Sequence, residues 1–373
     1  MRNASRWFWP FVAWIGLVAG WLCTPALAGS MRPRDSVVLI VLDGVRWQEV
    51  FRGMDGELLA NPAWSGSWLT PAELSSAYGA EDAAARRQRL MPFVWTQLIA
   101  HGQAFGNRDR HSEGTVTNPY WFSYPGYNEL LTGAADPRIN SNTFGPNPNT
   151  TVFEWVHRLA QPARPTVGVY ATWGEFHDIF NERRSGLLVH AGREGLDAND
   201  HSAMARAVAQ VYADSVSMEG QDTTDAMLMF RLERDLRRAR PQLLFVGLGD
   251  SDNWAHLKRY DLTLDAVHRD DQFIERLWQA YQRDPQTRGH TTFIVTTDHG
   301  RGASPLLWID HGVKNPGSNE WWVVVRGPRV VAAGERAEVA VTQSQVAATL
   351  LVALGLDPQQ FSAHAAPALD VFK

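Results

Sequence analysis

Acidic and imidazole side chains follow apolar runs at three places in the sequence. Asp43, Asp252 and Asp298 each come shortly after such a run. His299 is adjacent to Asp298, and His256 lies four residues after Asp252, a step that places both side chains on one face of a helical turn. Carboxylate and imidazole ligands suit zinc, and manganese and iron accept the same donors. The pattern predicts a metal centre; the alternative is that the aspartates only cap the turns that follow them.

Ser123 is the candidate nucleophile. It precedes a stretch in which Pro125 suits the first turn of a helix and Gly133 suits its end. Backbone N–H groups at the start of a helix favour bound anions. The alternative is that the Ser123 hydroxyl is simply the N-cap of this helix.

The apolar runs that precede the aspartates have the composition of strands buried on both faces. Runs rich in β-branched residues occur at 37–42, 166–170, 243–248, 293–297 and 322–325. Helical patterns lie between them, at about 92–101, 150–160, 201–217, 222–239, 262–283 and 343–354. This alternation predicts an α/β fold with a doubly wound, mostly parallel central sheet and helices on both faces. Ligands bind beyond the carboxyl ends of such strands, so the aspartates should meet in one cleft.

Length and charge limit the possible classes of protein. With 373 residues, the chain exceeds the roughly 150 residues of an average domain. We expect a single domain over residues 29–373, with polar insertions near 52–88 and 174–200. The formal net charge is −5 and basic residues are not clustered, which disfavours binding to nucleic acid.

The N-terminus has the pattern of a secretory signal peptide. Arg2 and Arg6 precede a short apolar stretch, and a small-x-small site ends at Ala28. We therefore expect a signal peptide over residues 1–28 and a periplasmic or secreted protein without a membrane segment after cleavage. The one cysteine, Cys23, would be removed, so the mature chain would have no disulfide. An uncleaved membrane anchor is the alternative, but the apolar stretch is shorter than the usual ~20 residues.

Five short motifs together resemble the alkaline phosphatase superfamily, and they are most similar to its nucleotide pyrophosphatase/phosphodiesterase-like branch. They occur in the order found there and extend over about residues 36–330. The motifs are Leu42-Asp43-Gly44, Ser123-Tyr-Pro-Gly-Tyr-x-x-Leu-Leu-Thr-Gly, Asp252-x-x-x-His256, Thr297-Asp298-His299-Gly300 and Asp310-His311-Gly312.

The resemblance implies two zinc ions, or other divalent ions such as Mn²⁺, bound by seven side chains. One ion would be held by Asp43, Ser123, Asp298 and His299, and the other by Asp252, His256 and His311. Asp250 competes with Asp252, but only Asp252 has the four-residue step to a histidine. The resemblance also implies an asparagine that contacts a phosphoryl oxygen, either Asn142 or Asn140.

The implied activity is hydrolysis of a small-molecule phosphate ester, either a monoester or a diester, through a phospho-Ser123 intermediate. Two divalent ions and three aspartates would leave a net positive charge beside Ser123. That charge would stabilise the serine alkoxide without a general base. A pair of ions about 3.5–4 Å apart could also stabilise the attacking and leaving oxygens of an in-line displacement.

Other members of the superfamily provide alternative functions. A sulfatase requires Cys/Ser-x-Pro-x-Arg, whereas this chain has Tyr127 at the arginine position. A phosphomutase and a metal-binding member without turnover also share the fold, but export disfavours the former and the full set of candidate ligands disfavours the latter. Aromatic residues near the motifs could stack on a base or a sugar, or could simply pack: Tyr120, Trp121, Phe122, Tyr124, Trp173 and Trp254.

Overall fold

The computed structural model describes residues 35–64, 66, 69–159, 166–194, 200–217 and 222–373. All of them belong to one compact unit, which spans residues 33–373. The predicted signal peptide, residues 1–28, lies outside the described residues. None of the described helices is long and apolar enough to cross a membrane.

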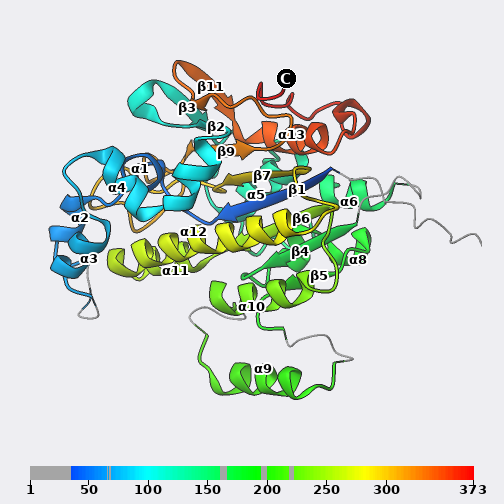
Figure 1. The fold of residues 1–373 in the computed structure, drawn as a ribbon, viewed down its shortest axis with the longest axis horizontal. Helices are drawn as coiled ribbons and strands as arrows, with labels where there is room; N and C mark the ends of the chain where they lie inside the picture. Colours follow the sequence, from blue (N-terminus) through cyan, green and yellow to red (C-terminus); the bar gives the residue numbers. More distant parts are fainter. Residues whose placement is uncertain (1–34, 65, 67–68, 160–165, 195–199, 218–221) are drawn as a thin grey trace, which may run out of the picture. The chain divides into compact units, whose positions relative to one another are not determined.

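An eight-stranded sheet has the strand order β10-β2-β9-β7-β1-β6-β4-β5 (Figure 1). The neighbours from β7 to β5 are all parallel, whereas β9 is antiparallel to both β7 and β2. The mostly parallel sheet that the sequence predicts is therefore confirmed. The strands, in sheet order, are Gly334–Glu335 (β10), Gln103–Phe105 (β2), Val323–Arg326 (β9), Thr291–Thr296 (β7), Ser36–Leu42 (β1), Leu243–Leu248 (β6), Val167–Ala171 (β4) and Val189–Ala191 (β5).

A second, three-stranded sheet has the order β11-β3-β8. Its strands are Val339–Thr342 (β11), Ser112–Thr115 (β3) and Glu320–Trp321 (β8). Strand β3 pairs antiparallel with β8 and leads into the segment that carries Ser123. This small sheet thus fixes the start of that segment.

Alternate residues of β1 point into two separate hydrophobic cores. Val38 and Ile40 belong to the first core, and Val37 and Leu39 belong to the second. Helices therefore cover both faces of the large sheet, as the sequence predicts (Figure 1). The first core includes residues of α1 (Trp47–Arg52), α2 (Gly56–Ala60), α3 (Pro71–Tyr78), α4 (Ala83–Leu90), η1 (Val94–Ile99), α10 (Asp225–Leu236), α11 (Asp250–His256) and α12 (Tyr260–Arg283). The second core includes residues of α5 (Ser123–Thr132), α6 (Val152–His157), α7 (Phe176–Ile179) and α13 (Val346–Ala353).

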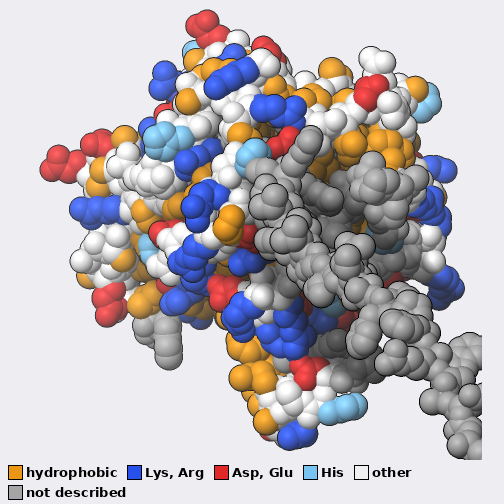
Figure 2. All heavy atoms as spheres, turned by 45° about the vertical axis from the view of Figure 1, so that its right-hand side comes forward, with side chains coloured by type: hydrophobic (Ala, Val, Ile, Leu, Met, Phe, Trp, Pro, Cys, Tyr) orange, Lys and Arg blue, Asp and Glu red, His pale blue; other side chains and the backbone are white. Residues whose placement is uncertain are grey.

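The remaining helices are short or pack outside these cores. They are η2 (Arg108–Arg110), α8 (Glu182–Ser185), α9 (Ala203–Asp214), η3 (Gln343–Gln345) and η4 (Pro358–Gln360). In α9, Ala205 and Val208 form a small cluster of their own. Met204 and Val211 of α9 are about half exposed, and Figure 2 shows hydrophobic side chains on this part of the surface.

The two polar stretches predicted as insertions have different places in the fold. Residues near 52–88 contain α2, α3 and most of α4, and Leu58 and Leu74 pack in the first core. Residues near 174–200 contain α7, α8 and β5, and β5 is the edge strand of the large sheet. Strand β5 has only three residues and one neighbour, so its pattern in the sequence is weak.

Candidate active site

The carboxyl ends of three neighbouring parallel strands carry the predicted acidic residues. Asp43 directly follows β1, and Asp298 follows β7 after one residue. Helix α11, which contains Asp252, begins one residue after β6. Because β7, β1 and β6 are adjacent in the sheet, these segments meet at one edge, as parallel strands require.

Two glycines allow the segments to approach each other closely. A Cβ atom at Gly44, where φ is +62°, would lie 2.4 Å from Asp252 Oδ1. A Cβ atom at Gly126 of α5 would lie 2.4 Å from the backbone oxygen of Asp298. The N–H of Gly44 also donates to Asp298 Oδ1 at 3.1 Å. The backbone itself therefore forms part of the wall of the site.

Ser123 is the first residue of α5 and is buried. The helix begins two residues before the predicted start at Pro125, because Phe122 takes the extended N-cap position. No side chain caps this helix, so the alternative of a purely capping Ser123 hydroxyl is wrong. The Ser123 Oγ atom instead lies 3.3 Å from His299 Nε2.

A buried glutamate, which the sequence reasoning missed, holds the segment before Ser123. The Glu129 carboxylate accepts hydrogen bonds from the backbone N–H groups of Thr117 and Asn118 and from the Ser344 hydroxyl. Asn118 Oδ1 in turn accepts from the N–H of Trp121, whose φ of +60° is unusual for a residue with a side chain. Glu129 lies six residues after Ser123 on the same helix, but nothing in the sequence indicates that it faces the preceding segment.

The first group of candidate ligands consists of Asp43, Asp298 and His299, all buried. His299 Nε2 lies 3.5 Å from Asp43 Oδ1 and 3.3 Å from Asp298 Oδ2. Neither of these carboxylate oxygens has a hydrogen-bond donor. Because His299 Nδ1 donates to the Gly300 carbonyl oxygen at 2.8 Å, Nε2 carries a lone pair. Two carboxylate oxygens without donors thus converge on an imidazole nitrogen whose neighbour in hydrogen-bond range is the Ser123 hydroxyl, an arrangement that a cation would satisfy.

Burial favours the uncharged form of each side chain in this group. It raises the pKa of Asp43 to about 6 and raises the pKa of Asp298 well above its usual value, where the charge of Asp43 adds to the effect. Burial also lowers the pKa of His299 to about 3. The positive charge of Arg301 opposes the rise in the pKa of Asp43 without cancelling it. A bound cation would therefore stabilise both carboxylates.

The second group of candidate ligands consists of Asp252, His256 and His311. His256 Nε2 lies 3.2 Å from Asp252 Oδ2 and 3.0 Å from His311 Nε2. His311 Nε2 lies 3.9 Å from Asp252 Oδ1. Asp310 also lies close to His256 and His311 and is a further candidate ligand that sequence reasoning missed, although it is part of the Asp310-His311-Gly312 motif. All seven predicted ligands are thus brought together: three form each group, and Ser123 lies beside His299 of the first.

A buried arginine adjoins the second group. Arg301 forms an ion pair with Asp252 and donates to the backbone oxygens of Trp308 and Ile309 at 2.9 Å and 2.7 Å. Burial lowers its pKa to about 9, so the guanidinium remains charged at neutral pH. Sequence reasoning missed Arg301, although it follows His299-Gly300 directly, because the sequence does not show which way this side chain points.

The structure separates the two pairs of alternatives that the sequence left open. Asn142 lines the same cavity as Ser123, and its Oδ1 accepts from the N–H of Tyr124 at 3.0 Å. Asn140 is exposed and is not among the residues that line this cavity. Asp252 lines the cavity as well, whereas Asp250 lines a different one.

A cleft of about 360 Å³ opens onto both groups. Among the described residues that line it, none is a lysine or an arginine. Beyond the candidate ligands, Glu175 and Asp222 add two further acidic side chains, and Trp173 adds an aromatic surface. The remaining lining residues are Asn142, Thr143, Thr172, Gly249 and Asn253. The cleft therefore has a strongly acidic lining unless cations are bound.

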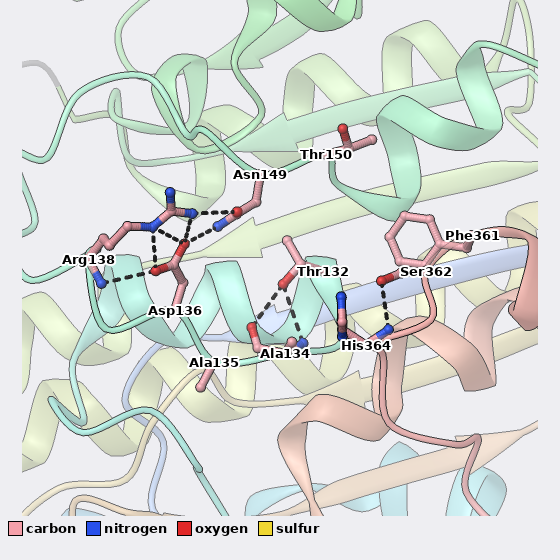
Figure 3. Close-up of a pocket in the computed structure, with 10 residues that line it drawn as sticks. All are labelled: Thr132, Ala134, Ala135, Asp136, Arg138, Asn149, Thr150, Phe361, Ser362 and His364. Atoms are coloured by element: carbon pink, nitrogen blue, oxygen red, sulfur yellow. Dashed lines mark hydrogen bonds and ion pairs between the residues drawn. The ribbon is translucent and has the colours of Figure 1, made fainter.

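Another cavity, of about 290 Å³, lies near the C-terminal end of α5 (Figure 3). Asp136 accepts hydrogen bonds there from Arg138 and Asn149, so these polar groups satisfy one another. None of the predicted site residues lines this cavity. The chemistry of the protein is therefore best assigned to the cleft beside Ser123.

A buried serine lies beside two Asp/His groups at the carboxyl ends of parallel strands, within an alkaline-phosphatase-like fold. Residues 144–349 match the family model described as type I phosphodiesterase / nucleotide pyrophosphatase. The chain belongs to this family, which confirms the resemblance that its motifs indicate. The family match makes the chain an ester-bond hydrolase. The matched stretch includes the candidate ligands from Asp252 to His311 and begins after Ser123.

Solved structures with the same fold include two that cover most of the chain. The lipoteichoic acid synthase LtaP from Listeria monocytogenes is 10% identical, with a TM-score of 0.55 over 89% of this chain and 75% of that one. The wild-type alkaline phosphatase PafA is 11% identical, with a TM-score of 0.54 over 91% and 99% of the two chains. A search of curated protein sequences gave no match. At these identities the structural likeness shows the fold alone.

Proposed function

We propose that this protein hydrolyses phosphodiesters with Ser123 as the nucleophile and two zinc ions as cofactors. The observation that carries the proposal is the convergence on His299 Nε2 of the Ser123 hydroxyl and two carboxylate oxygens that lack donors. The family membership supports ester hydrolysis in general. The serine intermediate and the zinc ions are inferred from the side chains themselves.

The residues of the two groups fit divalent cations. Asp43, Ser123, Asp298 and His299 would hold one ion, and Asp252, His256 and His311 would hold the other. The ligands are carboxylates, imidazoles and one serine hydroxyl, without cysteine, a set that suits zinc and also accepts Mn²⁺. When bound, the two ions would stabilise the serine alkoxide and the negative charge on the leaving oxygen.

The protein's own groups would then carry the reaction in two steps. Ser123 Oγ attacks phosphorus and loses its proton to solvent, and the bond from phosphorus to one alcohol breaks, so that this alcohol leaves with a proton from water. Water then attacks the phosphoserine, which releases a phosphate monoester and restores the serine hydroxyl. At the start of α5 the N–H of Tyr124 donates to Asn142 Oδ1 and Pro125 has no N–H, so the Ser123 N–H is the one that would donate to a bound phosphate. Asn142 Nδ2 would donate to a phosphoryl oxygen, because its Oδ1 is occupied by the Tyr124 N–H.

The charge of the cleft favours a diester over a monoester. A diester carries one negative charge on phosphate, whereas a monoester carries nearly two at neutral pH. No basic side chain among the described lining residues would bind the second charge, and Glu175 and Asp222 would repel it. At a few ångströms, each like-charge contact is unfavourable by about 1 kcal/mol in a water-like medium.

We therefore predict at least about a 10-fold higher kcat/KM for a diester than for a monoester, because about 1.4 kcal/mol corresponds to a factor of ten. The two substrates should share one chromogenic alcohol, and the matching sulfate ester should be assayed in parallel to test for sulfatase activity. Glu175→Gln should reduce the ratio of kcat/KM for the diester to kcat/KM for the monoester, since it removes one repelling charge at nearly constant volume. Faster hydrolysis of the monoester or of the sulfate ester would contradict the proposal.

The hydroxyl of Tyr127 should strengthen the binding of zinc by the first group of candidate ligands. It donates to Asp43 Oδ2 at 2.9 Å and leaves Oδ1 facing His299. We predict that Tyr127→Phe weakens zinc affinity by about 10-fold or more, because hydrogen bonds to ligands orient them. Competition with a chelating dye measures this change. Tyr124→Phe is the matched control, since that hydroxyl donates to the Gly145 backbone oxygen instead, and equal affinities in both variants would argue against the role of Tyr127.

A further inference from the structure

Two surface turns adjoin the second group of candidate ligands, and both expose apolar side chains. Leu257 directly follows His256 and is 56% exposed. Val313, two residues after His311, is 53% exposed, and Leu306, earlier in the same segment, is 73% exposed. Because His256 Nε2 lies 3.0 Å from His311 Nε2, the two turns are neighbours in space.

Hydrogen bonds hold the backbone of both turns. Lys258 has a φ of +62°, which is unusual for a residue with a side chain, and its N–H donates to the backbone oxygen of Ala255 at 2.9 Å. In the other turn, Asn315 donates from Nδ2 to the backbone oxygen of His311 and from its N–H to that of Gly312, both at 2.8 Å. A fixed backbone thus presents the apolar side chains to solvent. A group of exposed apolar side chains is typical of a binding surface.

Two lysines lie among these apolar side chains. The chain contains only three lysines, Lys258, Lys314 and Lys373, so two of them belong to these turns. Both are exposed, and neither side chain forms an ion pair or a hydrogen bond within the described part of the chain. The acidic residue of the two turns is Asp310, whose carboxylate lies against the imidazoles of the second ligand group. The two lysine charges are therefore available to an anionic partner.

The rim of the cleft continues past Gly312 to the segment that precedes Ser123. A Cβ atom at Gly312 would lie 3.7 Å from the backbone oxygen of Tyr120. The rings of Tyr120 and Phe122 lie 5.9 Å apart, and both residues are partly exposed. Tyrosine and lysine side chains both suit the boundary between water and lipid, because each has an apolar body and a polar tip.

The exposed side chains of the two turns form what we call the rim surface: Leu257, Lys258, Leu306, Leu307, Val313 and Lys314. We propose that the rim surface docks on the anionic surface of a lipid bilayer. The apolar side chains would enter the boundary between headgroups and acyl chains, and the lysines would contact anionic headgroups. None of the described helices could span a membrane, so the contact would be peripheral.

The composition of the rim surface favours a bilayer over a second copy of the chain. Lysine is depleted in interfaces between proteins, whereas it is the common partner of anionic lipid. His256 and His311 line the cleft, so docking would place the opening of the cleft beside the lipid headgroups.

The test uses the zinc-loaded chain of residues 29–373. It contains the compact unit of residues 33–373 and lacks the apolar N-terminal stretch, which could itself bind lipid. Binding is measured by cosedimentation with vesicles of equimolar phosphatidylglycerol and phosphatidylcholine, and with vesicles of phosphatidylcholine alone. We expect binding to the anionic vesicles, weaker binding to the neutral vesicles, and further weakening by added salt.

Lys258→Gln and Lys314→Gln should each weaken binding to the anionic vesicles by about 5-fold, and together by about 30-fold. Lys373→Gln is the matched control, because it removes the third lysine, which lies outside the rim surface. It should bind as the wild type does. Equal binding of both kinds of vesicle, or unchanged binding by the double lysine variant, overturns the proposal.

The apolar part of the rim surface is tested in the same way. Leu257→Ser combined with Val313→Ser should weaken binding by about 10-fold or more. Leu188→Ser should have no effect, although it removes a leucine that is 69% exposed, because Leu188 lies beside β5. A dimer that forms without lipid and dissociates in the Leu257→Ser, Val313→Ser variant would assign the surface to a second copy and overturn the proposal.

Hydrogen exchange of the wild type decides if a variant does not fold. Anionic vesicles should slow exchange at residues 256–258 and 312–314, and unchanged exchange there overturns the proposal. Because every readout is binding, the result is independent of the proposed reaction.

Discussion

The Ser123→Ala protein, loaded with metal, is expected to keep its fold and its metal content and to lose turnover by about 10³-fold or more. The reason is that covalent catalysis loses its acceptor, so that only direct attack by water remains. Six of the seven proposed ligands are unchanged. The hydroxyl caps no helix, so the free energy of unfolding should fall by less than the ~1 kcal/mol typical of a lost N-cap.

Steady-state rates per folded molecule, together with metal analysis of the same sample, measure this effect. Ser141→Ala is a suitable control, because Ser141 lies near Asn142 but its hydroxyl bonds only to the neighbouring Thr143. The control should retain nearly the wild-type rate. A folded and fully metallated Ser123→Ala protein that still hydrolyses phosphate esters at the wild-type rate would rule out a phosphoserine mechanism.

Removal of metal is expected to reduce activity to background, and re-addition of zinc is expected to restore it. Without cations, the Asp43 and Asp298 oxygens that face His299 have no donor and repel both each other and a substrate anion. The measurement is the rate after chelation and dialysis, followed by titration with Zn²⁺ and, separately, with Mn²⁺. The titration also shows which ion supports turnover.

The number of ions can be checked in the same experiment. The wild type should bind two equivalents of zinc, whereas His311→Gln should bind the second ion weakly, because it removes one of three ligands of that group. Tyr78→Phe is a control for general damage, since its hydroxyl donates to Asp265 of α12 and not to any of the ligands. Full activity in the presence of a strong chelator would refute the two-metal proposal.

The sequence predicts the ligand positions because long buried strands have a clear pattern. Strand β1 is buried along all of its seven residues, so its end, and with it Asp43, can be located from composition alone. The same holds for β6 and β7, which lead to Asp252 and Asp298. Parallel strands then imply that these ends meet, without any knowledge of distances.

Other parts of the site depend on contacts that a single sequence does not show. Glu129 and Arg301 are charged residues, for which exposure is the default expectation, yet both are buried against partners that are distant in sequence. Short elements such as β5 also lack a periodic pattern. The proposed preference for a diester could not be predicted from the sequence, because it depends on which side chains line the cleft.

The nucleophile and the second ligand group are supported by opposite layers of the protein. Helix α5 packs in the core on one face of the sheet through Tyr124 and Tyr127, whereas α11 packs in the core on the other face through Ala255. The strand ends between them are the shared support. A chain in which either layer is still unformed would have all the ligands but no assembled site. Activity is therefore expected to appear only at the final stage of folding, so that a partly folded intermediate is inert towards phosphate esters.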